Sequence, residues 1–154
     1  MLWRENNFRG ESKIKREEEF LQFETGTLSR NEMEAILDNL PVDLTFIDKE
    51  DSVKYFNKAE ERIFKRPKSV IGRKVQKCHP QKSVHIVNKI LDAFKAGEKN
   101  VAEFWIQLND RLIYIRYFAV RDRSGKYLGT VEVTQDITKI KKIEGEKRLL
   151  DWEE

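Results

Sequence analysis

The sequence predicts an α+β domain built on a five-stranded antiparallel sheet, with helices inserted between the second and third strands. Two alternating apolar segments flank a polar turn early in the chain, and three longer strand-like segments follow one another later. A segment with helical periodicity lies between the two groups. The strands are expected near residues 42–48, 53–57, 101–109, 111–121 and 127–136, and the longest helix near 80–96.

The sequence pattern divides the chain into three parts. Residues 1–28 are charged and weakly patterned, and they are expected to form an N-terminal extension or linker with a helical stretch at KIKREEEFLQF. Residues 29–138 hold the predicted domain, which begins with a flanking helix. Residues 139–154 are expected to form a C-terminal helical tail, because apolar side chains recur along them in an interrupted stripe.

The flanking helix is predicted at residues 29–40. Ser29 is a suitable N-cap, and Glu32 follows three residues later, which is the spacing of a capping box. Pro41 ends the helix, because the residue before a proline disfavours the helical conformation.

The longest helix, near residues 80–96, is predicted to open at His79-Pro80, because proline is favoured in the first turn of a helix. Gly97 closes it. The helical period gives it one apolar face, and His85 falls on the opposite side. The side chains expected in the core are Val87, Leu91 and Phe94.

Composition argues against several classes of protein. A single cysteine cannot form an internal disulfide, the N-terminal segment lacks the apolar core of a signal peptide, and no run approaches the roughly 18 apolar residues of a membrane helix. The 30 basic and 27 acidic residues are mixed along the chain, which indicates a solvated surface. We therefore expect a cytoplasmic protein without nucleic-acid or membrane partners.

Enzymatic activity is not expected. Only two histidines are present, the glycines are isolated at turns rather than grouped in a phosphate-binding loop, and no carboxylate pair stands out from the surrounding charge. Two classes of function remain: a module that binds a small molecule, and a docking or dimerisation module without a ligand.

Three segments resemble the PAS sensor fold. DLTFIDKEDSVKYFNKAEERIF is similar to the PAS opening, SVIGRKV followed by His-Pro is similar to its middle, and GTVEVTQDIT is similar to its last strand. The resemblance runs from about Leu37 to Thr138. LPVDLTFIDKEDSVKYF, RPKSVIGRKVQKCHPQKSVHIV and FWIQLNDRLIYIRYFAVRD are more closely similar to a prokaryotic family whose C-terminal PAS domain follows a hemerythrin-like domain.

This resemblance implies a sensory module that binds a small ligand or cofactor, dimerises, or does both, and regulates a linked upstream domain. In the resembled family that domain is hemerythrin-like. Residues 1–23 would then be its last helix or a linker, and the chain a fragment of a longer protein. The cofactor is unknown. Haem is one alternative, because some haem-binding PAS sensors use a histidine on the long helix.

The single cysteine and both histidines fall within KVQKCHPQKSVH. A metal site made of Cys78, His79 and His85 is the weaker interpretation, because adjacent side chains diverge and a zinc site needs a fourth ligand. The phase of the helix favours a surface role for His85 over haem ligation.

A two-residue turn at Asn109-Asp110 determines which residues pair across the flanking strands. One face of this hairpin is apolar, and the other pairs Trp105 with Tyr114 and Glu103 with Arg116. Arg116 either forms a cross-strand ion pair or belongs to a contact surface or pocket. The candidate ligand-binding residues are His85, Trp105, Tyr114 and Arg116.

The second face of the hairpin is expected to pack against another element or a partner, because an exposed apolar patch on a soluble monomer favours aggregation. Domains of the PAS type commonly pair through this face and the flanking helices, which implies a homodimer. In the alternative, the chain's own 29–40 helix covers the face and the protein is monomeric. The expected interface residues are Ile36, Leu40, Trp105, Tyr114 and Phe118.

Overall fold

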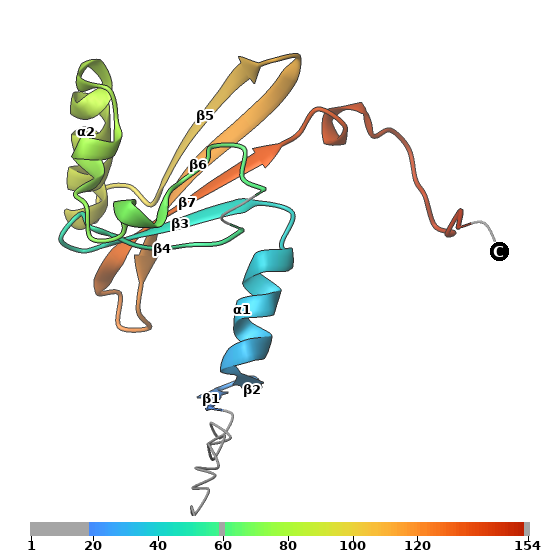
Figure 1. Cartoon of the computed structure of the whole chain (residues 1–154), viewed down its shortest axis with the longest axis horizontal. Coiled ribbons are helices and arrows are strands. Elements are labelled where there is room, and N and C mark those ends of the chain that lie inside the picture. Colours follow the sequence, from blue (N-terminus) through green and yellow to red (C-terminus); the bar gives the residue numbers. More distant parts are fainter. Residues whose placement is uncertain (1–18, 59–60, 153–154) are drawn as a thin grey trace, which may run out of the picture. The chain divides into compact units, whose positions relative to one another are not determined.

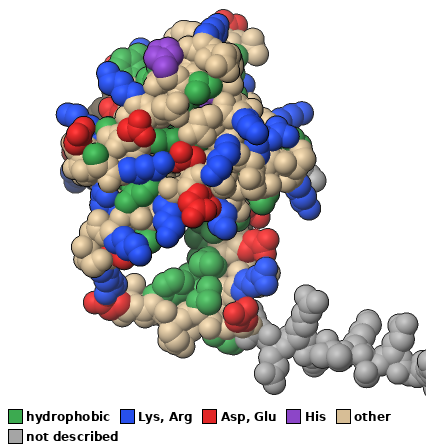
Figure 2. Space-filling view, turned by 90° about the vertical axis from the view of Figure 1, so that its left-hand side faces the viewer, with side chains coloured by type: hydrophobic (Ala, Val, Ile, Leu, Met, Phe, Trp, Pro, Cys, Tyr) green, Lys and Arg blue, Asp and Glu red, His purple; other side chains and the backbone are tan. Residues whose placement is uncertain are grey.

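The computed structural model describes residues 19–58 and 61–152 (Figure 1). The chain forms two units, Met1–Ile36 and Leu37–Glu154. Charges of both signs are interspersed on the face seen in Figure 2, in keeping with the mixed charge of the sequence. Within the described ranges, no helix has the length and apolar character needed to cross a membrane.

The first unit contains an antiparallel hairpin of β1 (Phe20–Phe23) and β2 (Gly26–Ser29), followed by the start of α1 (Arg30–Asn39). The capping box is confirmed: the Glu32 N–H donates to Ser29 Oγ over 3.1 Å, and the Ser29 N–H donates to Glu32 Oε2 over 2.8 Å. The helical stretch predicted at KIKREEEFLQF is wrong for residues 20–23, because they pair with β2 instead. The rest of that stretch, up to residue 18, lies outside the described residues.

The second unit contains a five-stranded antiparallel sheet, which confirms the predicted fold class. Cross-strand pairing in the long hairpin is as predicted, with Trp105 opposite Tyr114 and Glu103 opposite Arg116. The strands are β3 (Asp43–Asp48), β4 (Val53–Phe56), β5 (Val101–Leu108), β6 (Arg111–Arg121) and β7 (Tyr127–Asp136). They lie in the order β4-β3-β7-β6-β5.

Short 3-10 turns and α2 (Val84–Lys95) connect β4 to β5, and α2 lies beside the sheet (Figure 1). The predicted core face of the helix is confirmed: Leu91 and Phe94 are buried, and Val87 packs against the cluster formed by Ile47, Val75 and Leu91. The α-helix begins at Val84 rather than near residue 80, because a separate 3-10 turn at Gln81–Ser83 follows Pro80.

After β7, the chain does not form the helix expected at 139–154. A 3-10 turn at Ile140–Lys142 is the only helical element described in this tail, whose last two residues lie outside the description. Gly145 has a φ of +65°, which interrupts the helical path. Leu149 and Trp152 are 84% and 80% exposed, so no apolar burial supports a short helix that is marginal by itself in water.

Candidate functional site

A cleft of about 720 Å³ lies between α2 and the sheet. This volume falls within the range typical of small-molecule sites. The cleft has an apolar wall and a cluster of polar side chains. Its lining residues are Phe64, Lys65, Arg66, Cys78, His79, Pro80, Ser83, Ile86, Val87, Ile90, Phe104, Ile106, Ile115, Tyr117 and Glu132.

Two periodicities build the apolar wall. Ile86 and Ile90 are four residues apart on α2 and therefore share one side of the helix. Phe104 and Ile106 are two residues apart on β5 and therefore share one face of the sheet. Ile86 and Ile106 are each 40% exposed, and Phe104 is 38% exposed. Large apolar side chains are thus left open to solvent around a concave surface, as in a ligand site.

The polar cluster centres on Glu132 of β7, a carboxylate that is buried. Arg66 Nη2 lies 3.1 Å from Glu132 Oε1, which forms a salt bridge within the cleft. Burial is the main cause that raises the Tyr117 pKa well above its ordinary value, and the nearby Glu132 carboxylate acts in the same direction. The Tyr117 hydroxyl is therefore protonated at neutral pH and able to donate a hydrogen bond.

One buried hydrogen-bond donor of Arg66 has no partner among the described residues. This donor is the Nε–H. A buried donor without an acceptor costs about 1–3 kcal/mol. The guanidinium therefore has hydrogen-bonding capacity that the described residues do not use.

His79 lies beside this cluster. Burial is the main cause that lowers its pKa below the ordinary value; the Arg66 charge acts in the same direction, and the Glu132 charge opposes both. The imidazole is accordingly neutral at neutral pH, with one nitrogen able to donate a hydrogen bond and the other able to accept one.

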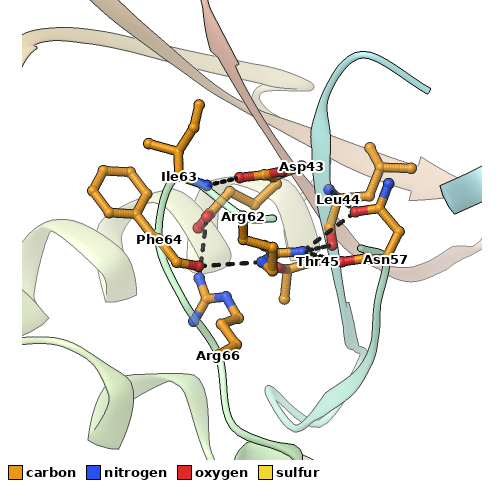
Figure 3. Close-up of polar contacts among 9 residues, drawn as sticks. Asp43, Leu44, Thr45, Asn57, Arg62, Ile63, Phe64 and Arg66 are labelled. Atoms are coloured by element: carbon orange, nitrogen blue, oxygen red, sulfur yellow. Dashed lines mark hydrogen bonds and ion pairs between the residues drawn. The ribbon is translucent and has the colours of Figure 1, made fainter. Parts of the chain in front are cut away.

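The segment that carries Arg66 is anchored by Arg62, which is buried (Figure 3). Arg62 Nη1 donates to the carbonyls of Leu44 and Asn57, each over 2.9 Å, and Nη2 donates to Thr45 Oγ1 over 2.9 Å. Arg62 Nε donates to the Phe64 carbonyl over 3.2 Å. One guanidinium therefore links β3, the residue after β4 and the start of the cleft-lining segment.

The lowered pKa of His79 predicts a pH-dependent stability. Between the folded and unfolded pKa values, the unfolded chain binds more protons, so stability rises with pH there. We expect the urea midpoint to fall when the pH is lowered through the unfolded value of about 6.5. His79→Gln should remove this fall of the urea midpoint. His85→Gln, at an exposed position of α2, should retain it. An unchanged profile in His79→Gln would contradict the assignment.

The candidate ligand-binding residues named from the sequence do not line the cleft. His85 is exposed on α2. Trp105, Tyr114 and Arg116 alternate with cleft-lining residues along β5 and β6, so they point to the other face of the sheet. On that face Arg116 lies over the rings of Tyr114 and Phe118, at 4.9 and 5.4 Å from their centroids.

The side chain of Glu103 bonds to Tyr114 rather than to Arg116, the ion-pair partner considered above. The Tyr114 hydroxyl donates to Glu103 Oε1 over 2.6 Å. The Arg116 Nε–H is buried without a hydrogen-bond partner among the described residues, and its guanidinium stacks on aromatic rings instead.

The structure does not bring Cys78, His79 and His85 together into one group. Among residues 19–58 and 61–152, no group of three His, Cys, Asp or Glu side chains is placed to hold a metal ion. Cys78 and His79 line the cleft, whereas His85 is exposed on α2. The exposed position of His85 is the one that the phase of the helix predicted.

Sequence reasoning missed the residues that form the polar cluster. Arg66 and Glu132 meet across 66 positions of the chain, so no local spacing connects them. One signal was available: Glu132 alternates with Thr130 and Thr134 on the inner face of β7, and all three are buried. A carboxylate at such a position requires a partner.

Comparison with known proteins identifies relatives of the domain. A family model described as "PAS domain" matches residues 33–138. The crystal structure of a C-terminal domain from Streptococcus mutans is 34% identical, with 82% of this chain and 98% of that chain covered and a TM-score of 0.76. The chain therefore belongs to the PAS domain family, whose fold is that of sensory and signalling modules.

More distant solved structures share the fold. The PAS domain of a Colwellia psychrerythraea protein is 19% identical, covering 71% of this chain and 97% of that chain with a TM-score of 0.52. The PAS domain of BvgS from Bordetella pertussis is 20% identical, covering 69% and 84% with a TM-score of 0.53. No curated protein sequence matches the chain.

Proposed function

We propose that this domain is a non-catalytic sensor that binds a small organic ligand in the cleft between α2 and the sheet and transmits its presence to a linked or associated protein. The observation that carries the proposal is the cleft itself. It combines exposed apolar side chains with a buried polar cluster that contains an unused donor. This combination is typical of sites that bind a ligand and orient it.

The test compares two isoleucine-to-tryptophan variants. Ile90→Trp fills the cleft, whereas Ile71→Trp places the same bulk at a position that is 47% exposed and does not line the cleft. We expect mass spectrometry of the denatured wild-type protein and of Ile71→Trp to detect a small molecule at near-stoichiometric amounts. Ile90→Trp should release none. Release of the same molecule by all three folded proteins would place the ligand elsewhere.

The face of the sheet opposite the cleft supports a second proposal, namely homodimerisation. Trp105 is 66% exposed and Val101 is 47% exposed on this face. Tyr114 and Phe118 belong to the same face by strand alternation. Ile36 is also 49% exposed on α1, and Leu40 directly follows that helix. A docking module without any ligand would use this face of the sheet.

We expect light scattering to give about twice the 18.4 kDa mass of the chain. Trp105→Glu should reduce this mass to that of one chain, because a carboxylate cannot be buried unpaired in an interface. Trp152→Glu, which changes the same residue type at a position that is 80% exposed in the tail, is the matched control and should stay dimeric. A monomeric wild-type protein would contradict the proposal.

The signal is proposed to regulate an upstream hemerythrin-like domain. Support comes from the resemblance in the segments quoted above and from the Streptococcus mutans relative, which is described as a C-terminal domain. Sequencing the gene upstream of the codon for Met1 tests this arrangement directly. An upstream hemerythrin-like coding region in frame is the expected result.

A further inference from the structure

The cleft lining is not electrically balanced. Lys65 and Arg66 contribute two cations, and Glu132 contributes the only carboxylate among the described lining residues. Glu132 is already paired with Arg66, so the lining retains one positive charge. An anionic group entering the cleft would therefore be attracted by an uncompensated cation.

The charge of the lining and the buried Arg66 donor together favour a carboxylate. Arg66 is bonded to Glu132 through Nη2, and its buried Nε–H has no acceptor among the described residues. Guanidinium donors match the oxygens of carboxylates and of phosphates alike, but one uncompensated positive charge matches a carboxylate better than a phosphate monoester, which carries a charge of about −1.5 to −2. A carboxylate that accepted from Arg66 and lay near Lys65 would satisfy both the charge and the missing hydrogen bond.

The rest of the cleft requires an apolar ligand body. Ile86 and Ile90 of α2 face Phe104, Ile106 and Ile115 of the sheet across the cleft. Three of these side chains are at least 38% exposed, so a hydrocarbon chain would remove substantial apolar area from water. Such a chain needs no hydrogen-bond partners along its length, and this wall provides none.

We propose that the ligand of this cleft is an amphipathic monocarboxylate, with its carboxylate on Arg66 and Lys65 and its hydrocarbon chain between α2 and strands β5 and β6. This inference rests on the proposed function of the cleft and names the ligand class.

Three probes of different charge and length test the inference on the full chain by isothermal titration calorimetry. Decanoate has both the carboxylate and the hydrocarbon chain. Decanol has a chain of the same length without the charge, and acetate has the carboxylate without the chain. We expect decanoate to bind at least about tenfold more tightly than decanol, because a hydrogen bond to a charged group contributes more than a neutral one. Acetate should show no measurable binding.

Variants locate the head group. Arg66→Gln leaves the buried Glu132 carboxylate unpaired, so the double variant Arg66→Gln/Glu132→Gln removes both charges and avoids that strain. We expect the double variant to bind decanoate about tenfold more weakly and to bind decanol unchanged. Lys89→Gln changes an exposed cation of α2 that does not line the cleft, and it should behave as the wild type.

The outcomes separate the two proposals. Equal affinity for decanoate and decanol, or an unchanged decanoate affinity in the double variant, would overturn the carboxylate assignment while ligand binding in the cleft stands. If neither long-chain probe binds but the purified protein still releases a small molecule on denaturation, only the ligand class is wrong. If no probe binds and nothing is released, both proposals fall.

Discussion

Arg62→Met is expected to destabilise the domain by about 3–5 kcal/mol. The substitution keeps most of the apolar stem but removes the guanidinium that donates to Leu44, Thr45, Asn57 and Phe64. Arg62 is only 6% exposed, so water cannot fully replace these donors. The free energy of unfolding in urea measures the effect.

Two controls give this result its meaning. Arg62→Lys retains the charge but cannot reproduce the planar set of donors, and it should still lose most of the stability. Arg73→Met applies the same substitution at an exposed arginine and should change the unfolding free energy by less than about 0.5 kcal/mol. A similar small change in Arg62→Met would mean that the anchor of the cleft segment lies elsewhere.

Gly129→Ala is expected to cost about 3–5 kcal/mol or to prevent folding. Gly129 lies in β7, the central strand, with a φ of +156°. A Cβ atom there would lie 2.1 Å from the Ile47 carbonyl oxygen and 2.8 Å from the Phe46 ring. Because the first of these atoms belongs to the backbone of β3, relief requires the two strands to move apart.

Gly125→Ala is the matched control. Gly125 also has a positive φ, +85°, but a Cβ atom would meet nothing within 4 Å. Its cost should therefore be limited to backbone strain of about 1–2 kcal/mol. Equal costs for the two variants, measured by thermal or urea unfolding, would show that the contact with β3 is readily relieved.

Features encoded by local spacing were predictable from the sequence. Ser29 and Glu32 form the predicted capping box because its hydrogen bonds span three residues. Asn109 and Asp110 adopt positive φ values of 48° and 61°, as a two-residue hairpin turn requires, and they thereby set the pairing of β5 with β6. The helical period likewise separated the buried Leu91 from the exposed His85.

Features that depend on tertiary contacts were not predictable in this way. The segment KIKREEEFLQF was predicted to be helical, but its last four residues, 20–23, pair with β2 across the turn at residues 24–25. The polar cluster joins Arg66 to Glu132 from distant parts of the chain. His79 was interpreted as the residue before a helix-opening proline or, less favoured, as a metal ligand, yet it lines the cleft. The pairing of Trp105 with Tyr114 was predictable because the turn at Asn109-Asp110 determines it locally, but this pair lies on the face of the sheet opposite the cleft.

The central claim is that a small molecule occupies the cleft between α2 and the sheet. Isoleucine methyl NMR tests it directly, because Ile86, Ile90, Ile106 and Ile115 line the cleft, whereas Ile71 and Ile143 are exposed and do not line it. Spectra are compared between protein purified under native conditions and protein refolded after its small molecules have been removed in denaturant. We predict that the four cleft methyl signals shift and that those of Ile71 and Ile143 do not. Identical spectra, or shifts confined to Ile71 and Ile143, would contradict the claim.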